Sequence, residues 1–110
     1  MIMKVLTAEL VASNRREKIS GGVYIEFETL DNVKKDDYFK VRVGDNNYDF
    51  QATGIKVIGE SLKITAKEVG YWAWKLDHKG VDLRQVIGCD ITPVTDKDEK
   101  SKIYERSCWC

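Results

Sequence analysis

The side chains best suited to chemistry are one histidine and three cysteines. Histidine can act as a general base or a metal ligand, but His78 lies within Asp-His-Lys-Gly, whose neighbours are turn-forming residues. We therefore interpret His78 as a solvated turn residue. The sequence also lacks the GxSxG, HExxH and phosphate-loop motifs. We predict a non-enzymatic protein with no catalytic residues, and a carboxylate pair assembled from distant strands stays an open alternative.

The terminal Cys108-Trp109-Cys110 permits two kinds of modification or binding. Together with Cys89 and His78, the two thiols would make a four-ligand zinc site, but structural zinc sites usually present two pairs of closely spaced ligands. A terminal CxC also accepts geranylgeranyl groups in some small GTPases, whose phosphate-binding motifs are absent from this chain. We predict no metal and no cofactor, and we interpret Cys89 as a small buried apolar residue.

The most informative segment is the aromatic run Tyr71-Trp72-Ala73-Trp74. In a strand, Trp72 and Trp74 point to one side and Tyr71 to the other, so one aromatic set faces away from the core. In the structural interpretation the tryptophans fill a barrel, with Tyr71 at its rim. In the functional interpretation they contact a partner, because Trp and Tyr are enriched at interface hot spots. The predicted partner-binding residues are Tyr71, Trp72, Trp74, Lys63 and Lys67.

Charge disfavours nucleic acid as the partner. The chain has 18 Lys and Arg against 18 Asp and Glu, so no net positive field attracts a polyanion. A basic outer face interleaved with Tyr71 would suit single strands. If successive strands pair, however, Glu26 and Glu28 lie opposite Lys40 and Arg42 and neutralise that face. The basic residues concerned are Lys40, Arg42, Lys56, Lys63, Lys67 and Lys75.

Length and composition indicate one ordinary globular domain. The chain has 110 residues, 43% of them hydrophobic and 33% charged, which excludes a disordered or low-complexity segment. The odd number of cysteines argues against a disulfide framework, and no apolar stretch reaches the length of a signal peptide or a membrane span. We therefore expect a cytoplasmic protein with reduced thiols and no membrane partner.

Hydrophobicity of period two predicts strands along most of the chain. Gly44–Asn47 and Gly59–Ser61 are turn signals between alternating runs, and Gly54 predicts a bulge. Asp82 is expected to cap a helical turn on which Leu83, Val86 and Ile87 share a face. The predicted strands cover 6–13, 23–28, 39–43, 48–58, 62–67 and 89–94.

These elements predict an all-β fold, a small barrel of five to six strands with one short helical turn before the last strand. The order of elements is that of SH3-like barrels, and an OB-like barrel is the alternative. We assign residues 1–95 to the barrel domain and 96–110 to a charged C-terminal tail. Thr95 with Asp98 offers a cap for a short helix through Ile103 and Tyr104. Pro93 suggests an edge position or a strand end.

The functional hypothesis is a non-catalytic interaction module that binds another protein through a sheet face or edge, with the Pro93 strand as the expected edge. Free-standing barrels of this size are common among phage proteins. One form of the hypothesis is therefore a phage-encoded inhibitor of a host enzyme or defence complex, and another is a virion connector. A single-strand nucleic-acid-binding protein of OB-like fold is the third alternative. The sequence predicts no oligomeric state.

Overall fold

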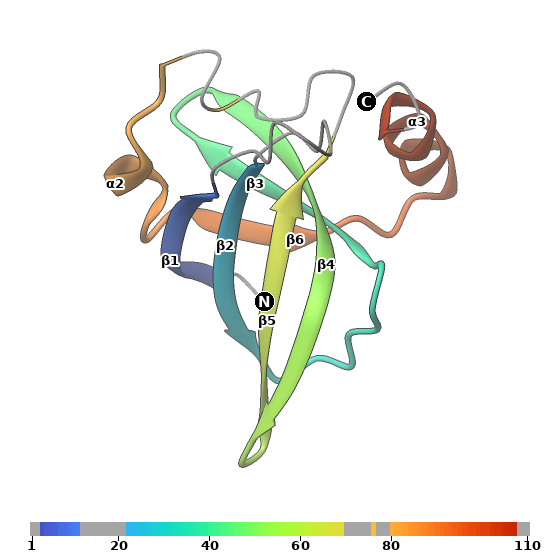
Figure 1. The fold of residues 1–110 in the computed structure, drawn as a ribbon. Helices are drawn as coiled ribbons and strands as arrows, with labels where there is room; N and C mark the ends of the chain where they lie inside the picture. Colours follow the sequence, from blue (N-terminus) through green and yellow to red (C-terminus); the bar gives the residue numbers. More distant parts are fainter. Residues whose placement is uncertain (1–2, 12–21, 70–75, 77–79, 108–110) are drawn as a thin grey trace, which may run out of the picture.

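A computed structural model describes residues 3–11, 22–69, 76 and 80–107. Two of its strand connections are tight turns, at Gly44 and Gly59, which both have a φ of 60°. The elements in chain order are β1 (Met3–Val11), β2 (Gly22–Thr29), β3 (Tyr38–Val43), β4 (Asn46–Ile58), β5 (Ser61–Glu68), α2 (Leu83–Val86), β6 (Asp90–Pro93) and α3 (Lys97–Ser107) (Figure 1).

The strands form a closed antiparallel barrel in the order β1-β2-β5-β4-β3-β6. Tight hairpins join β3 to β4 and β4 to β5, and β6 returns to lie beside β3, which is a Greek-key arrangement. The predicted β-barrel with a helical turn before its last strand is confirmed. The expected edge strand is wrong, because β6 pairs with both β1 and β3 and Pro93 is its last residue.

The barrel interior is filled by the alternating apolar side chains of every strand. Phe27 and Phe39 meet edge to face, with ring centroids 4.8 Å apart. The alternation of apolar residues predicted for 23–28, 39–43, 48–58 and 62–67 matches the structure, because every second residue in the central part of β2 to β5 is almost fully buried. The principal interior residues are Val5, Val23, Ile25, Phe27, Phe39, Val41, Tyr48, Phe50, Ala52, Ile64, Ala66 and Ile91.

Two bulges bend the strands. The bulge predicted at Gly54 is confirmed, since Thr53 is an extra residue between the pairs formed by Ala52 and Gly54, and its hydroxyl donates to the Thr65 carbonyl at 3.1 Å. A second bulge in β1 places Leu6 between the pairs formed by its neighbours. The uninterrupted alternation predicted for this strand is therefore wrong at Leu6, which is exposed.

The helix before β6 begins as predicted. The Asp82 carboxylate accepts from the Arg84 amide at 2.9 Å, and Gly88 follows the helix with a φ of 84°. Val86 is buried, but Ile87 lies beyond the last helical residue and is exposed. The predicted shared face is therefore wrong for Ile87, because the helix ends before that residue.

The segment 96–110, expected as a charged tail, contains the 11-residue helix α3. Asp96, and not Thr95, caps it, since the Asp96 carboxylate accepts from the Asp98 amide at 2.8 Å and the Glu99 amide at 3.1 Å. Ile103 is fully buried in a second apolar cluster with Val69 and Val94. One apolar residue thus docks a helix that is otherwise mostly polar.

Candidate protein-binding surface

The β4–β5 hairpin extends beyond the rest of the barrel (Figure 1). Gly59 and Glu60 form its turn, so β4 and β5 continue to pair past the last core layer as far as Ile58 and Ser61. Val57 is 71% exposed and Ile58 is 41% exposed. The hairpin therefore presents large apolar side chains to solvent at its tip.

Two further exposed leucines, Leu6 and Leu30, line a hollow that reaches the first residue of β5. The hollow has a volume of about 370 Å³, and that first residue, Ser61, is the pairing partner of Ile58. Leu30 is 66% exposed. Single exposed apolar residues are ordinary, whereas several on neighbouring segments are candidates for a contact surface. We call Leu6, Leu30, Val57 and Ile58 the hairpin end.

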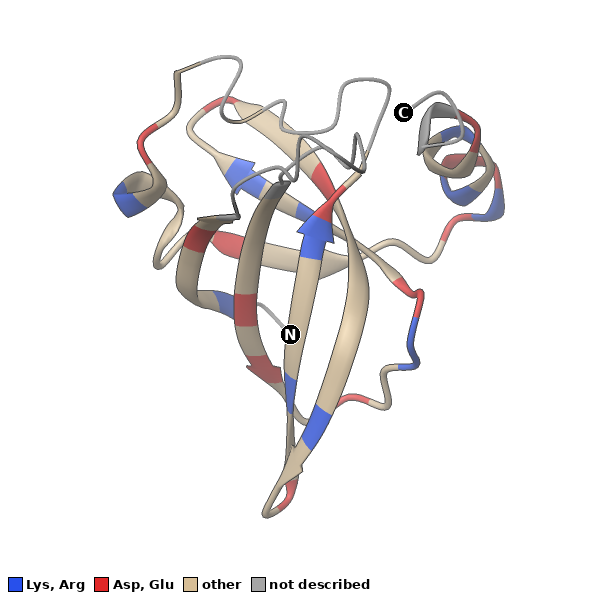
Figure 2. Ribbon diagram, in the orientation of Figure 1, with Lys and Arg blue, Asp and Glu red and all other residues tan. Residues whose placement is uncertain are grey.

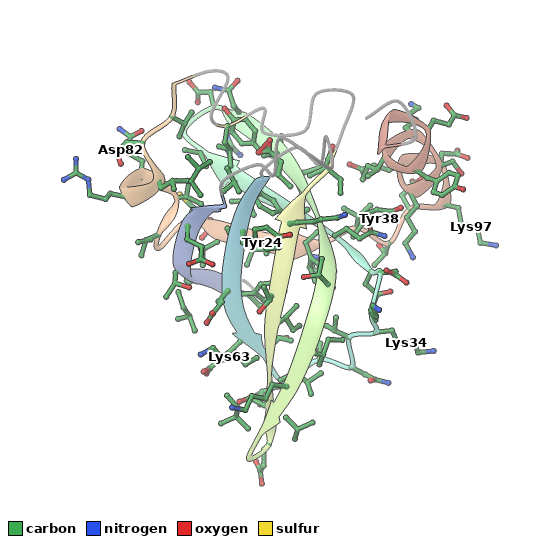
Figure 3. All side chains as sticks on the ribbon, in the orientation of Figure 1. Tyr24, Lys34, Tyr38, Lys63, Asp82 and Lys97 are labelled. Carbon is green, nitrogen blue, oxygen red and sulfur yellow. The ribbon has the colours of Figure 1, made fainter. Side chains whose placement is uncertain are left out.

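Lysines flank the hairpin end on the outer face of the sheet. Lys56 of β4 is the pairing partner of Lys63 of β5, which places two like charges side by side. Lys63 binds the Glu26 carboxylate at 3.0 Å and is also opposite Glu28, so neighbouring acids compensate it (Figures 2 and 3). Lys56 makes no ion pair with any residue that the structure describes. Lys63, which the sequence predicts as a partner-binding residue, therefore lies beside the hairpin end.

Lys67 lies nearer the other end of β5, opposite Tyr24 of β2 and Gln51 of β4. The predicted contact residues Tyr71, Trp72 and Trp74 lie outside the described residues. The two predicted lysines therefore share one strand, and their relation to the aromatic run stays a prediction.

A buried carboxylate, which the sequence did not single out, lies where β5 ends. Glu68 is 4% exposed, and both of its oxygens accept from the amide of buried Leu76 at 3.1 Å. The Val69 amide donates to the Asp49 carbonyl at 2.9 Å. The residues on either side of segment 70–75 are thus tied to the barrel. In the sequence, Glu68 could have been noticed because it ends an alternating strand and directly precedes Val69 and Gly70.

Tyr48 is buried near this carboxylate. Burial raises the pKa of the Tyr48 phenol, and the negative charge of Glu68 raises it further. A phenol whose pKa is higher in the folded state stabilises the fold below the unfolded value of about 10, and this contribution is lost as the pH rises above it. The expected result is that Tyr48→Phe flattens the fall in stability above about pH 10. Urea unfolding between pH 8 and 11 checks this, and an unchanged alkaline slope would contradict it.

The basic residues of β3 do not join those of β5. Arg42 donates to the Gly44 carbonyl at 3.2 Å and lies opposite Asp90, and Lys40 binds Glu99 of α3. The predicted pairing of Glu26 with Lys40 is wrong, because β2 pairs with β1 and β5 instead of β3. Opposite charges nevertheless lie on neighbouring strands, since Lys40 is opposite Asp49.

A polar cleft of about 770 Å³ separates part of α3 from the barrel. Acidic side chains predominate in its lining, and Lys40 binds Glu99 there. Beside this polar cleft, α3 contacts the barrel through the buried side chain of Ile103. The lining residues are Lys40, Asn47, Asp49, Asp96, Asp98, Glu99, Lys102 and Glu105.

The cysteine within the described part of the chain is poorly suited to reaction. The Cys89 thiol donates to the Gln85 carbonyl at 2.8 Å, and burial raises its pKa, as does the charge of Asp90. The other candidate zinc ligands, His78, Cys108 and Cys110, lie outside the described residues. Within residues 3–11, 22–69, 76 and 80–107, no three metal-ligating side chains gather into a site.

Comparison of the chain with protein-family models, curated proteins and solved structures found no match. Neither α2 nor α3, the helices of the described segments, has the length and apolar character needed to cross a bilayer. The geometry above is therefore the basis for the functional proposal.

Proposed function

We propose that the protein is a non-catalytic module that binds another protein, and that the hairpin end is its contact surface. The observation that carries this proposal is the exposure of Val57 and Ile58 on a projecting hairpin, whose residue Ser61 lines a hollow together with exposed Leu6 and Leu30. Burying such side chains against a partner is favourable in proportion to the apolar area removed from water. The projecting hairpin also gives a partner access to Val57 and Ile58 from more than one side (Figure 1).

The predicted contact residues extend this surface along β5. Lys63 flanks the hairpin end, and Lys67 lies further along the same strand. We propose Tyr71, Trp72 and Trp74, which follow β5 in the chain, as a second set of contacts. Charged residues at the border of an apolar contact mainly set its specificity and its rate of association.

A phage-encoded inhibitor of a host enzyme or defence complex is the form of this proposal that we favour, on the basis of the small size of the barrel. The comparison with SH3-like barrels rests on the order of elements along the chain. A virion connector is the alternative form. A connector would assemble into rings at high concentration, whereas an inhibitor would stay small until its target is added, so light scattering distinguishes the two.

Single-stranded nucleic acid is the less favoured partner. Lys63 is compensated by Glu26, and Lys40 by Glu99 of α3, so the outer face carries both signs of charge (Figure 2). A nucleic-acid-binding protein would lose affinity steeply with added salt. Binding of an oligonucleotide that weakens in this way and requires Lys63 would favour this alternative.

The test is capture from a lysate of the native host by tagged wild-type protein and by a Val57→Ser, Ile58→Ser double variant, each with nuclease. We expect one dominant protein to survive nuclease and its capture to fall at least about tenfold in the double variant. Ile87→Ser is the matched control, because Ile87 is also exposed but lies beside α2. Equal capture by all three proteins would remove the hairpin end from the proposal, and loss of all captured material with nuclease would favour nucleic acid.

A further inference from the structure

Along one stretch of the barrel, the outer edge of β4 has no pairing partner among the residues that the structure describes. β4 pairs with β3 only between Asn46 and Gln51. At the next residue, the Ala52 amide donates to the Asp37 carbonyl at 2.9 Å, and the Ala52 carbonyl accepts from the Asp36 amide at 3.0 Å. Beyond Ala52, residues 53–58 pair only with β5 among the residues that the structure describes.

The register shows which backbone groups are available on that edge. In antiparallel strands, opposed residues alternate between pairs that exchange hydrogen bonds and pairs whose backbone groups point away from each other. Ile58 and Ser61 flank a two-residue turn and form a hydrogen-bonded pair, so Lys56 and Gly54 also bond to β5. Ile55 and Val57 therefore direct their amides and carbonyls away from β5. The outward bonds of Ala52, across the bulge, agree with this alternation.

We propose that this edge of β4 binds an extended segment of the partner protein, which adds a strand beside Ile55 and Val57. This inference rests on the proposed function and specifies the partner's chemistry. A strand added to a sheet edge gains affinity from main-chain hydrogen bonds and specificity from alternate side chains. Val57 lies on this edge and also exposes its side chain. One partner segment could therefore both hydrogen-bond to the edge and cover that side chain.

The side chains along the edge specify the segment. Directly opposed residues share a face of the sheet, so partner residues beside Ile55 and Val57 continue an apolar face. On the other face, Lys56 makes no ion pair with a residue in the described part of the chain, and Lys63 lies next to it. An acidic residue opposite Lys56 complements this charge. The expected segment is therefore extended, with β-branched or other apolar residues alternating with acidic ones.

A second copy of the chain fits this edge less well. Two β4 edges paired about a twofold axis would bring the Lys56 and Lys63 side chains of both copies together on one face. Lysine on an edge strand commonly prevents this kind of self-association, since like charges repel across the new pair. The same lysines attract an acidic segment, so the charge pattern selects a different partner.

Position-specific amide exchange provides the first test. A displayed library of random ten-residue peptides is selected against the full chain, and a selected peptide is synthesised for titration. We expect selected sequences to alternate acidic and apolar residues, and we expect bound peptide to slow exchange of the Ile55 and Val57 amides at least tenfold. The amides of Gly54 and Lys56, already bonded to β5, are the internal control. Selection of no peptide, or binding without this protection, would overturn strand addition.

The Val57→Pro variant provides the second test. Proline at this position removes an outward amide and leaves the bonds between β4 and β5 in place. Val57→Ala is the matched control, because it shortens the side chain and retains the amide. We expect Val57→Pro to weaken peptide binding at least tenfold more than Val57→Ala does. Equal affinities would overturn the proposal, and the exchange measurement on wild-type protein decides the matter if Val57→Pro does not fold.

The two proposals fail in different ways. If the Val57→Ser, Ile58→Ser variant loses lysate capture and Val57→Pro retains it, the hairpin end binds a protein without strand addition. If neither change affects capture, both proposals are wrong. A dimer that forms with rising concentration and disappears in Val57→Pro would show that the edge pairs with a second copy, which would overturn the proposed occupant.

Discussion

Replacing Phe27 by alanine is expected to lower the free energy of unfolding by about 3–5 kcal/mol, the usual cost of removing a buried aromatic side chain. Phe27 is fully buried, and its ring meets that of Phe39 edge to face at 4.8 Å. Small domains are stable by about 5–15 kcal/mol in total, so the variant would unfold at much lower denaturant concentration.

Urea unfolding followed by tryptophan fluorescence measures this effect. Leu30→Ala is the matched control, because Leu30 directly follows β2 but is exposed, and its expected cost is below about 0.5 kcal/mol. The same control variant should weaken partner binding if the hairpin end is the contact surface. A cost below about 1 kcal/mol for Phe27→Ala would contradict the placement of this ring in the core.

Replacing Ile103 by alanine is expected to destabilise the docked helix α3 by about 2–5 kcal/mol and to leave the barrel folded. Ile103 is fully buried against Val69 and Val94. An isolated helix of 11 residues is marginal in water, so α3 depends on this contact to stay helical. The expected result is fast amide exchange throughout residues 97–107 with unchanged protection of the barrel strands.

Tyr104→Ala is the control for this prediction, because the neighbouring Tyr104 is 61% exposed. Its exchange pattern should match that of the wild-type protein in α3 as well as in the barrel. If Ile103→Ala instead loses amide protection in both α3 and the barrel strands, the helix and the barrel unfold as one cooperative unit.

Local patterns predicted most of the elements. Alternation predicted the strand over 23–28, whose Val23, Ile25 and Phe27 are buried, because a strand with one buried face repeats every second residue. Gly44 and Gly59 marked the hairpins, since a positive φ there requires a residue with little steric restriction. The position of the helical turn followed from the cap at Asp82.

Long-range pairing could not be predicted in the same way. Alternation does not state which strands are neighbours, so the position of β2 between β1 and β5 emerges only from the closed barrel. The edge beside Ile55 and Val57 depends on that pairing and had no local signal. Ile103 was difficult for another reason, since one apolar residue among charged ones produces no helical periodicity.

The pairings of the short strand β6 lead us to expect that it docks late in folding. It has four residues, and it closes the barrel by joining Met3 to Ile91 on one side and Phe39 to Pro93 on the other. Contacts between residues so distant in the chain form slowly, because the loop between them must close first, whereas the β3–β4–β5 hairpins form locally. Until β6 docks, β1 and β3 each expose an edge to neighbouring molecules. If β6 docks last, we expect the partly folded chain to be the state most prone to aggregate.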